Sequence, residues 1–397
     1  MQKLKKRSAL LLIAVFVLFL AAAVALTVRN RGKTYSFYEN RNLAPLPAAS
    51  EQSVLDGSYF SALEKYLIDR AAGHTALARL DTRIDLALRR PVIHDVVVRE
   101  DILLPWLPYE TVDPAAITAA AERMAQRLAP VSELVESYGG MYCYAAVPCQ
   151  YAYHEDRYPS YLNNRSAYTA LSREALRAAL AEAGVDYLDV GEVFDALGHP
   201  DAFSSAVDNH YSIYGALETG RAILSRFNAR GASLRVPEEA DFTAETVPSP
   251  YLGSRTRKLL GTRTSDERLV RLDLAEPIPF TRRDNGHDSY SYVYAAGAET
   301  DGYITYNFYM GGDIANTVID TDRPELPSIL VYGDSFTNAV ECLIWPSFDR
   351  MYSLDFRHYQ DMTLGEYIET YRPDYVVCIR DYEALLSPEC NGTGLDG

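Results

Sequence analysis

The chain has 397 residues, enough for two or three domains with substantial cores, and its 48% apolar and 23% charged residues exclude wholesale disorder. The formal net charge is −16, and residues 1–33 carry seven Lys or Arg and no acid, so the remaining 364 residues have a net charge of −23. This negative charge on residues 34–397 repels the phosphate backbone of nucleic acids, and we therefore expect no nucleic-acid partner.

Residues 9–28 form an uncharged apolar run. Twenty helical residues reach about 30 Å, the thickness of a bilayer core, whereas the apolar region of a cleaved signal has only about 7–15 residues. Four basic residues precede the run and three follow it, which favours an N-terminus inside the cell. The sequence predicts a basic tail and a transmembrane helix over residues 1–33, anchoring an extracytoplasmic body to the cell membrane by one span. A signal cleaved at Ala23-Val24-Ala25 is the alternative.

Residues 34–106 are expected to hold a linker followed by helices and strands. The stretch 38–50 is rich in Asn, Pro and Ala, and apolar residues then recur at helical spacing over 58–90. Residues 92–104 have the composition of strands and end at Pro105-Trp106.

From residue 107 to 390 we expect one α/β domain, followed by a C-terminal tail over 391–397. Asp113-Pro114 is typical of a helix start, because the aspartate can cap the helix and proline suits its first position. Helices and short apolar strands then alternate, which predicts a parallel sheet covered on both faces. The helices are expected over 113–138, 172–183 and 213–229, and the strands over 141–147, 185–190, 328–332, 351–356 and 375–379. The alternation fails between about 235 and 325, where strand-like pieces such as 269–274 and 303–309 predict a β-rich insertion.

None of the five cysteines is in C-x-x-C spacing, so neither a zinc site nor a redox motif is expected: Cys143, Cys149, Cys342, Cys378 and Cys390. Cys143 and Cys149 are close enough in sequence to pair, but their apolar context favours ordinary burial. The odd number leaves at least one thiol free or bonded to another chain. We expect no metal and no cofactor.

Gly333-Asp334-Ser335 directly follows the apolar strand predicted over 328–332. Because α/β folds place their ligands at the carboxyl ends of parallel strands, this serine is a candidate nucleophile. A serine or aspartate that caps a helix explains the same tripeptide, so the motif alone is weak.

Asp208 and His210 form the second candidate element, just before the helix expected from 213. In an extended turn residues i and i+2 project to the same side, so the carboxylate can hold one imidazole nitrogen and leave the other as a base. None of the other six histidines has a carboxylate two residues before it. An Asx turn with an incidental histidine is the alternative, but Ser335, His210 and Asp208 together supply a nucleophile, a base and an orienting acid.

Several segments make nearly the whole chain resemble the DHHW family of Gram-positive bacterial proteins, which is similar to the SGNH-hydrolase-like proteins of alginate O-acetylation. Asp208-Asn209-His210-Tyr211 stands at the family's D-H-H-W signature, with Asn209 and Tyr211 replacing its first His and its Trp. The other segments that carry the resemblance are 40–47, 64–70, Tyr306–Asp313 (YNFYMGGD), Gly333–Asn338 (GDSFTN) and Leu354–Arg357 (LDFR).

The resemblance implies an SGNH-hydrolase-like three-layer α/β sandwich that acts as a serine O-acetyltransferase or acetylesterase on a cell-surface or secreted polysaccharide. Ser335, His210 and Asp208 would be catalytic, and the candidates for oxyanion or substrate contacts are the Ser335 N–H, Gly312, Asn338, Arg357 and Tyr211. It also implies a multi-span membrane acyltransferase as the acyl donor. The 30 tyrosines fit a glycan-binding cleft or, equally, strand structure.

The alternative function is a non-catalytic glycan-binding or scaffold protein of the cell envelope. A metal-dependent phosphohydrolase would need clustered His and Asp ligands, which the sequence does not show.

Overall fold

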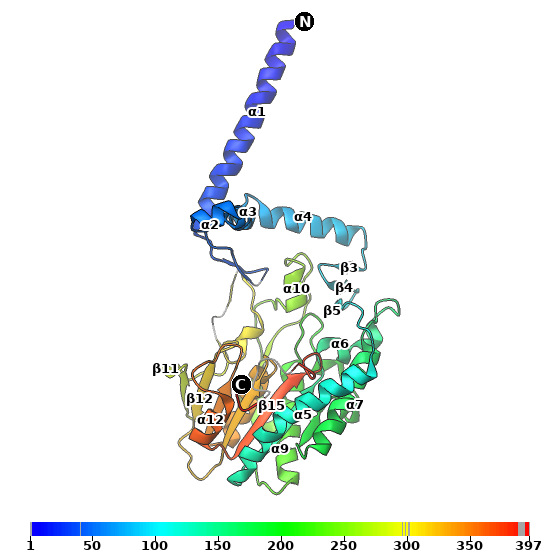
Figure 1. Cartoon of the computed structure of the whole chain (residues 1–397), viewed down its shortest axis with the longest axis vertical. Coiled ribbons are helices and arrows are strands. Elements are labelled where there is room, and N and C mark those ends of the chain that lie inside the picture. Colours follow the sequence, from blue (N-terminus) through cyan, green and yellow to red (C-terminus); the bar gives the residue numbers. More distant parts are fainter. Residues whose placement is uncertain are drawn as a thin grey trace. The chain divides into compact units, whose positions relative to one another are not determined.

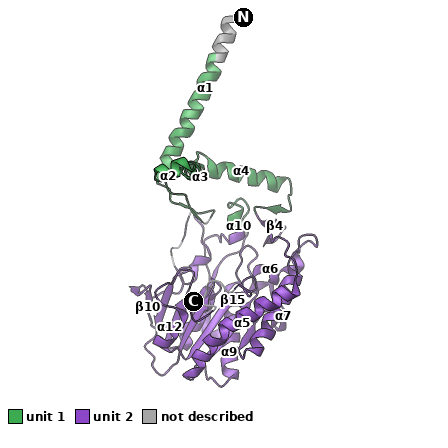
Figure 2. Ribbon diagram, viewed as in Figure 1, with its two compact units in different colours: residues 1–94, 256–264 green, residues 95–255, 265–397 purple. Residues whose placement is uncertain are grey.

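The computed structural model describes residues 2–39, 41–295, 297, 299–300, 302–387 and 394–396. The chain divides into two compact units, drawn in different colours in Figure 2: residues 1–94 with 256–264, and residues 95–255 with 265–397. The domain boundaries predicted at 33, 106 and 390 stay predictions, and Asn40, Cys390 and most of the predicted tail lie outside the described residues.

The first unit begins with the helix α1, Gln2–Arg29. Within it and the turn that follows, Leu10–Gly32 has a mean hydropathy of 3.0 and no buried part. Among the described residues, this is the one helix long and apolar enough to cross a membrane, as the sequence predicts.

The rest of the first unit consists of short elements. They are β1 (Tyr35–Ser36), β2 (Arg41–Asn42), α2 (Glu51–Leu55), α3 (Ser58–Arg70), α4 (His74–Ala87) and β3 (Val92–Ile93). The predicted helical stretch is therefore two helices, because the chain turns at Gly73, which has a left-handed φ of +76°. The buried Arg70 guanidinium donates to the carbonyls of Lys33 and Ala44, which ties the linker to α3.

The second unit holds the α/β fold (Figure 1). Its helices are α5 (Pro114–Ser137), α6 (Gln150–Tyr153), α7 (Ser166–Glu182), α8 (Val190–Ala196), α9 (Ile213–Ala229), α11 (Thr337–Ile344) and α12 (Leu364–Tyr371). Its first strands are β4 (Val96–Val98), β5 (Leu103–Pro105), β6 (Met141–Val147) and β7 (Tyr187–Asp189). The later ones are β8 (Phe242–Thr246), β9 (Val270–Leu274), β10 (Thr281–Asp284), β11 (His287–Ser289), β12 (Asn316–Asp320), β13 (Ser328–Gly333), β14 (Arg350–Leu354) and β15 (Tyr375–Asp381). The short helix α10 (Ser254–Lys258) follows β8.

The central sheet has eight strands in the order β11-β10-β12-β14-β13-β15-β6-β7. The five strands from β14 to β7 are parallel, as predicted, and those at its centre are buried along almost their whole length. The sheet is not purely parallel, however, because β10, β11 and β12 extend it in antiparallel register. The predicted β-rich insertion thus adds three strands to the central sheet.

Two groups of helices cover this sheet, which gives the predicted three-layer architecture. α5 packs against α7 and α12, α9 packs against α8 and α11, and both α5 and α9 contact β6. Two helix starts are fixed by capping: Asp113 accepts the N–H groups of Ala115 and Ala116 at α5, and Ser212 accepts the first free N–H groups of α9.

Two further predictions have different outcomes. Residues 303–309, predicted as strand-like, instead form a 3-10 helix at Tyr306–Phe308 flanked by isolated β-bridges, because the following Gly311 and Gly312 turn the chain with φ near +90°. The burial expected for Cys143 and Cys149 is confirmed, and neither is paired. Cys342 and Cys378 are also buried and unpaired.

Candidate active site

Ser335 lies where the central strand β13 ends. Gly333 closes that strand with φ +151°, and a Cβ added there would stand 2.0 Å from the carbonyl oxygen of Ile379 on β15. Only glycine allows the two strands to approach so closely while the chain turns toward α11. The sequence therefore presents Ser335 at the carboxyl end of the sheet, in the turn before the helix.

Asp334 braces this turn. One of its carboxylate oxygens accepts the N–H of Phe336 at 3.0 Å, and the other accepts the N–H of Asp381, also at 3.0 Å, at the end of β15. Burial raises the pKa of Asp334, and burial together with the neighbouring charge of Asp334 raises the pKa of Asp381. The turn that holds Ser335 is therefore fixed to the neighbouring strand by a side chain as well as by backbone.

His210 and Asp208 lie in the segment that leads into α9. His210 contacts Ser335, which lies 125 residues further along the chain. The Nε2 atom of His210 lies 2.7 Å from the Ser335 Oγ, and its Nδ1 lies 2.5 Å from the Asp208 Oδ1. The structure thus brings the three predicted residues into one hydrogen-bonded line.

The environment keeps Asp208 ionised. Burial of its carboxyl raises the pKa, but the charge and hydrogen bond of His210, the N–H of Ser254 and the charge of Arg255 outweigh burial, so the pKa lies well below its usual range. An ionised Asp208 selects the tautomer of His210 that carries its proton on Nδ1, which leaves Nε2 free to accept the Ser335 proton.

Buried polar contacts hold this acid in place. The guanidinium of Arg255 donates to the side-chain oxygens of Gln150 and Asn209, and the N–H of Gln150 donates to the Asn209 carbonyl. These contacts join α6 to the segment that carries Asp208, so the acid lies on a rigid support.

Two tyrosines contact the site. The ring of Tyr306 stacks on His210 with centroids 3.7 Å apart and planes 5° from parallel. The predicted substrate candidate Tyr211 is buried, and its hydroxyl donates to the carbonyl of Phe336, the residue after Ser335. Tyr211 therefore braces the turn, and its hydroxyl is already engaged.

The remaining candidates form a chain of polar contacts from the start of α11. The Asn338 amide donates to Asp313, Asp313 pairs with Arg357 at 3.0 Å, and Arg357 makes a bidentate pair with Asp355. The backbone N–H of Gly312 already donates to the Tyr309 carbonyl. Gly312 therefore has no free N–H for an oxyanion in this structure, whereas Asn338 has a second amide hydrogen.

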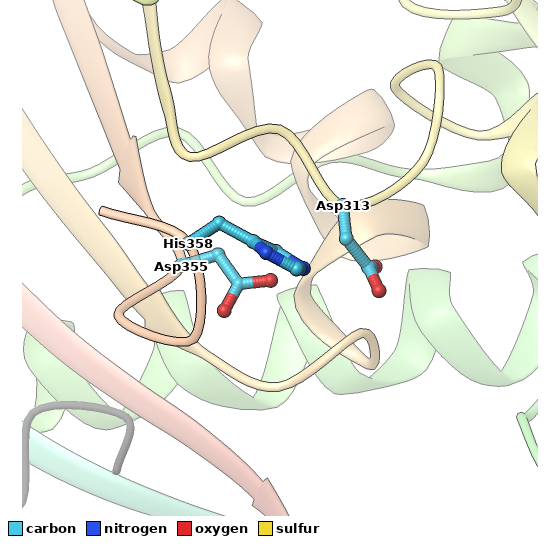
Figure 3. A group of neighbouring side chains, drawn as sticks. All are labelled: Asp313, Asp355 and His358. Atoms are coloured by element: carbon cyan, nitrogen blue, oxygen red, sulfur yellow. The ribbon is translucent and has the colours of Figure 1, made fainter. Parts of the chain in front are cut away.

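One group of side chains has the arrangement of metal ligands. Asp313, Asp355 and His358 each offer a ligand atom, all within 4.8 Å of one another, and Figure 3 shows the three side chains converging. Arg357 pairs with both carboxylates, however, so their negative charge is already compensated by a side chain. We therefore assign no metal to this group.

Sequence reasoning missed Tyr306, Ser254, Arg255 and Asp313 as parts of the site. Tyr306 and Asp313 lie in the segment YNFYMGGD, which carries the family resemblance. That resemblance is the one feature of the sequence that could have placed these two residues at the site. Ser254 contributes only its backbone N–H, and no side-chain pattern reveals such a contact.

A three-layer α/β fold with a serine, a histidine and an aspartate in line at the end of its sheet is the class of protein that the structure defines. No protein-family model and no curated protein matches the chain. Among solved structures, Bacillus cereus PatB1 is similar with a TM-score of 0.61 and 18% identity, over 73% of this chain and 96% of that chain. PatB1 with a sulfonyl adduct is similar with a TM-score of 0.60 and 17% identity, over 73% and 94%.

A DHHW family protein from Eubacterium siraeum is also similar, with a TM-score of 0.53 and 17% identity over 74% of this chain and 93% of that chain. At such identities the likeness shows the fold. It confirms the predicted α/β fold class and the resemblance to the DHHW proteins.

Proposed function

We propose that the chain is a serine O-acyltransferase or esterase of O-acetyl groups, with a cell-surface or secreted polysaccharide as its substrate. The observation that carries the proposal is the line Ser335, His210 and Asp208, with contacts of 2.7 and 2.5 Å. In this geometry a hydroxyl can be deprotonated as it attacks a carbonyl carbon.

In the proposed reaction the Ser335 oxygen bonds to the acyl carbon while His210 takes the hydroxyl proton on Nε2. The tetrahedral intermediate collapses, the acyl–donor bond breaks, and His210 returns the proton to the leaving oxygen. A sugar hydroxyl or water then attacks the acyl-serine by the same proton transfers in reverse order. Asp208 stabilises the imidazolium that forms in both halves.

The oxyanion needs hydrogen-bond donors that are free. Among the described residues the Ser335 N–H has no acceptor, and Asn338 uses one of its amide hydrogens on Asp313. We infer that the Ser335 N–H and the second Asn338 hydrogen stabilise the oxyanion, in place of Gly312. Arg357 is paired with two carboxylates and is a better support for Asp313 than a substrate ligand.

The N-terminal helix supports a membrane location for this reaction. We propose that α1 anchors the body outside the cytoplasm with the N-terminus inside, as its basic flanks favour. An acyl group made in the cytoplasm must then cross the bilayer, so a multi-span membrane acyltransferase is the proposed donor.

A labelling experiment tests the proposal. PatB1 is known with a sulfonyl adduct, so we expect a sulfonyl fluoride or a fluorophosphonate to modify Ser335 in the full-length chain in detergent. Ser335→Ala should abolish labelling and His210→Ala should slow it strongly, whereas the exposed controls Ser137→Ala and His287→Ala should label like the wild type.

If the wild-type protein stays unlabelled and releases no acetate from an aryl acetate, the proposed enzymatic activity is wrong. The alternative, a non-catalytic glycan-binding or scaffold protein of the envelope, would then be favoured, and it predicts glycan binding that is independent of Ser335.

A further inference from the structure

Two helices of the first unit leave large apolar side chains exposed. On α4 four such side chains, which we call the apolar stripe, are 50–65% exposed: Leu77, Leu80, Ile84 and Leu88. At about 100° per residue they fall within an arc of about 80° around the helix, so they form one continuous face. On α3 the side chains of Phe60, Leu67 and Ile68 are exposed as well. Soluble domains rarely expose so much contiguous apolar surface, so this face is expected to bind something.

The opposite face of α4 packs against the rest of the first unit. The Nε atom of Arg79 donates to the Leu260 carbonyl at 2.9 Å, and the Thr82 hydroxyl lies 3.0 Å from the Nε2 atom of His94. All four residues belong to this unit. Arg79 and Thr82 lie about 140–200° around the helix from Leu77. The apolar stripe therefore points away from the residues on which α4 packs.

The turn between α3 and α4 is bonded to the end of α1. The N–H of Ala72 donates to the Thr27 hydroxyl at 3.1 Å. The Asn30 side chain donates to the Arg70 carbonyl, also at 3.1 Å. Thr27 and Asn30 lie within Leu10–Gly32, the stretch long and apolar enough to cross a membrane. A bilayer that takes up this stretch therefore brings the turn, and the start of α4, to its surface.

The direction of the stripe follows from the arrangement of the first unit. Figure 2 shows α4 running across the direction of α1 rather than alongside it. In the same view the segment 256–264, which includes Leu260, lies on the side of α4 away from α1. Because the apolar stripe points away from Leu260, it faces the side from which α1 leaves. The stripe is therefore directed toward the bilayer that α1 is proposed to span.

The charge of this part of the chain suits a lipid surface. Residues 51–90, from α2 to just past α4, carry six Lys or Arg and six Asp or Glu, so their net charge is zero. Residues 34–397 together have a net charge of −23, all of which therefore lies outside this stretch. Anionic headgroups repel residues 51–90 less than they repel the rest of the body.

We propose that the apolar stripe of α4, together with the exposed side chains of α3, docks on the outer lipid surface of the bilayer that α1 spans. The proposal rests on the membrane anchor proposed above and not on the proposed reaction. An amphipathic helix of this kind lies in the plane of the interface, with its apolar face about 5–10 Å deep at the boundary of headgroups and acyl chains. The stripe would then give the first unit a second membrane contact beside α1, which limits how the unit can tilt.

Tryptophan quenching by brominated lipids tests the docking in the full-length chain, reconstituted in vesicles of phosphatidylcholine and phosphatidylglycerol. Ile84→Trp places a fluorophore in the stripe, and the wild type gives the background from Trp106 and Trp345. We expect bromine in the upper part of the acyl chains to quench the added fluorescence roughly twofold, and bromine near the chain ends to quench it less. Phe19→Trp, near the middle of the apolar run of α1, should show the reverse order.

Matched controls separate lipid contact from simple exposure. Leu197→Trp places the fluorophore at a leucine of the second unit that is 50% exposed, as Ile84 is, and the lipids should not quench it. In the Ile84→Trp chain, Leu80→Asp puts a charge into the stripe and should lower the quenching roughly threefold, because a carboxylate resists entry into the acyl-chain boundary. Leu197→Asp in the same chain should leave the quenching unchanged. Circular dichroism of each variant confirms that it is folded.

The outcomes separate the docking from the anchor. Quenching of Phe19→Trp but not of Ile84→Trp overturns the docking and leaves the anchor standing. Ile84→Trp emission that moves to shorter wavelength as protein density rises, without lipid quenching, assigns the stripe to a second copy of the chain and also overturns it. Quenching that Leu80→Asp does not change has the same consequence.

The reverse results bear on α1. If Ile84→Trp is quenched in a way that depends on Leu80 and Phe19→Trp is not quenched, the docking stands and the membrane span is wrong. If neither is quenched, both are wrong. Labelling of Ser335 tests the proposed reaction and is independent of each of these results.

Discussion

At the scale of single residues, the candidate site depends on groups whose surroundings leave them little freedom. Asp208 has a side chain only 3% exposed, and His210 one 13% exposed. The ring of His210 is fixed between the carboxylate, the Ser335 hydroxyl and the parallel ring of Tyr306. Such enclosure orients a base before any substrate arrives, which is the arrangement that acyl transfer requires.

Removing either end of the proton transfer should abolish turnover. We expect Ser335→Ala and His210→Ala each to lower acetate release from an aryl acetate by roughly 10⁴-fold or more, and the double variant to lose no more, because the pair acts as a unit. Asp208→Ala should lower the rate of acetate release less, since a misoriented imidazole still accepts some protons. All three should fold, and Ser335→Ala with undiminished turnover would exclude a serine mechanism.

Gly333→Ala tests the turn that precedes the candidate nucleophile Ser335. The added Cβ would lie 2.0 Å from the Ile379 carbonyl and force φ +151° on alanine, so β13 and β15 must separate. We expect the free energy of unfolding to fall by roughly 2 kcal/mol or more, which lowers the melting temperature. We also expect activity to be lost. Gly286→Ala is the matched control, because φ there is +78° with open space around the Cβ. Equal effects in the two variants would contradict the close approach.

The sequence predicts these residues unequally, for physical reasons. Asp208 and His210 are visible because an i, i+2 pair shares one side of an extended turn, and Ser335 because it follows an apolar strand. Tyr306 lies 96 residues from His210, and nothing local to either residue encodes their stacking. Gly312 was a candidate for an oxyanion or substrate contact, but its N–H donates to the Tyr309 carbonyl in the turn that follows the 3-10 helix.

At the scale of elements, α11 carries a buried carboxyl group, that of Glu341, on the helix that follows the candidate nucleophile Ser335. Glu341 is 1% exposed, and it accepts the Ser353 hydroxyl of β14 at 2.8 Å. Burial raises its pKa to about 7, although Thr337, Ser353 and Arg282 oppose the effect. The folded chain therefore holds this proton more tightly than the unfolded chain does.

The sign of the pH effect follows. Between an unfolded pKa of about 4.3 and the folded value of about 7 the native state binds more protons, so Glu341 makes stability fall as pH rises through this range. Glu341→Gln should remove this contribution, and its stability relative to wild type should rise from pH 5 to pH 8. Urea unfolding at both pH values measures it, with the exposed Glu369→Gln as control. A difference that does not change with pH would contradict the buried proton.

Element prediction succeeded where burial is uniform and failed where it alternates. β6, β13 and β15 are buried almost throughout, so their apolar runs identify parallel strands. In β12 buried and partly exposed residues alternate, which suits an antiparallel strand but does not say which sheet it joins. Its pairing with β14 joins residues 316–320 to residues 350–354, and no local sequence pattern encodes such a pairing.

At the scale of the whole molecule, the N-terminal helix leads to a prediction about where the protein is found. If Leu10–Gly32 spans the bilayer, the full-length chain should stay with membranes through alkaline carbonate washing and enter solution only with detergent. Its N-terminus should be unprocessed. A chain without residues 1–33 is the control and should need no detergent, and a mature chain that begins near Leu26 in the medium would show a cleaved signal instead.

The position of β15 in the sheet has a consequence for biogenesis. This strand, Tyr375–Asp381, follows the other seven strands of the sheet in sequence, yet it lies between β13 and β6 in the middle of the sheet. Until the ribosome has made it, β6 and β13 each present an unpaired apolar edge, and Asp334 lacks its partner N–H at Asp381. Chains that stop before β15 therefore present two unpaired apolar strand edges and lack one of the hydrogen bonds that hold the turn at Ser335, so we expect them to aggregate.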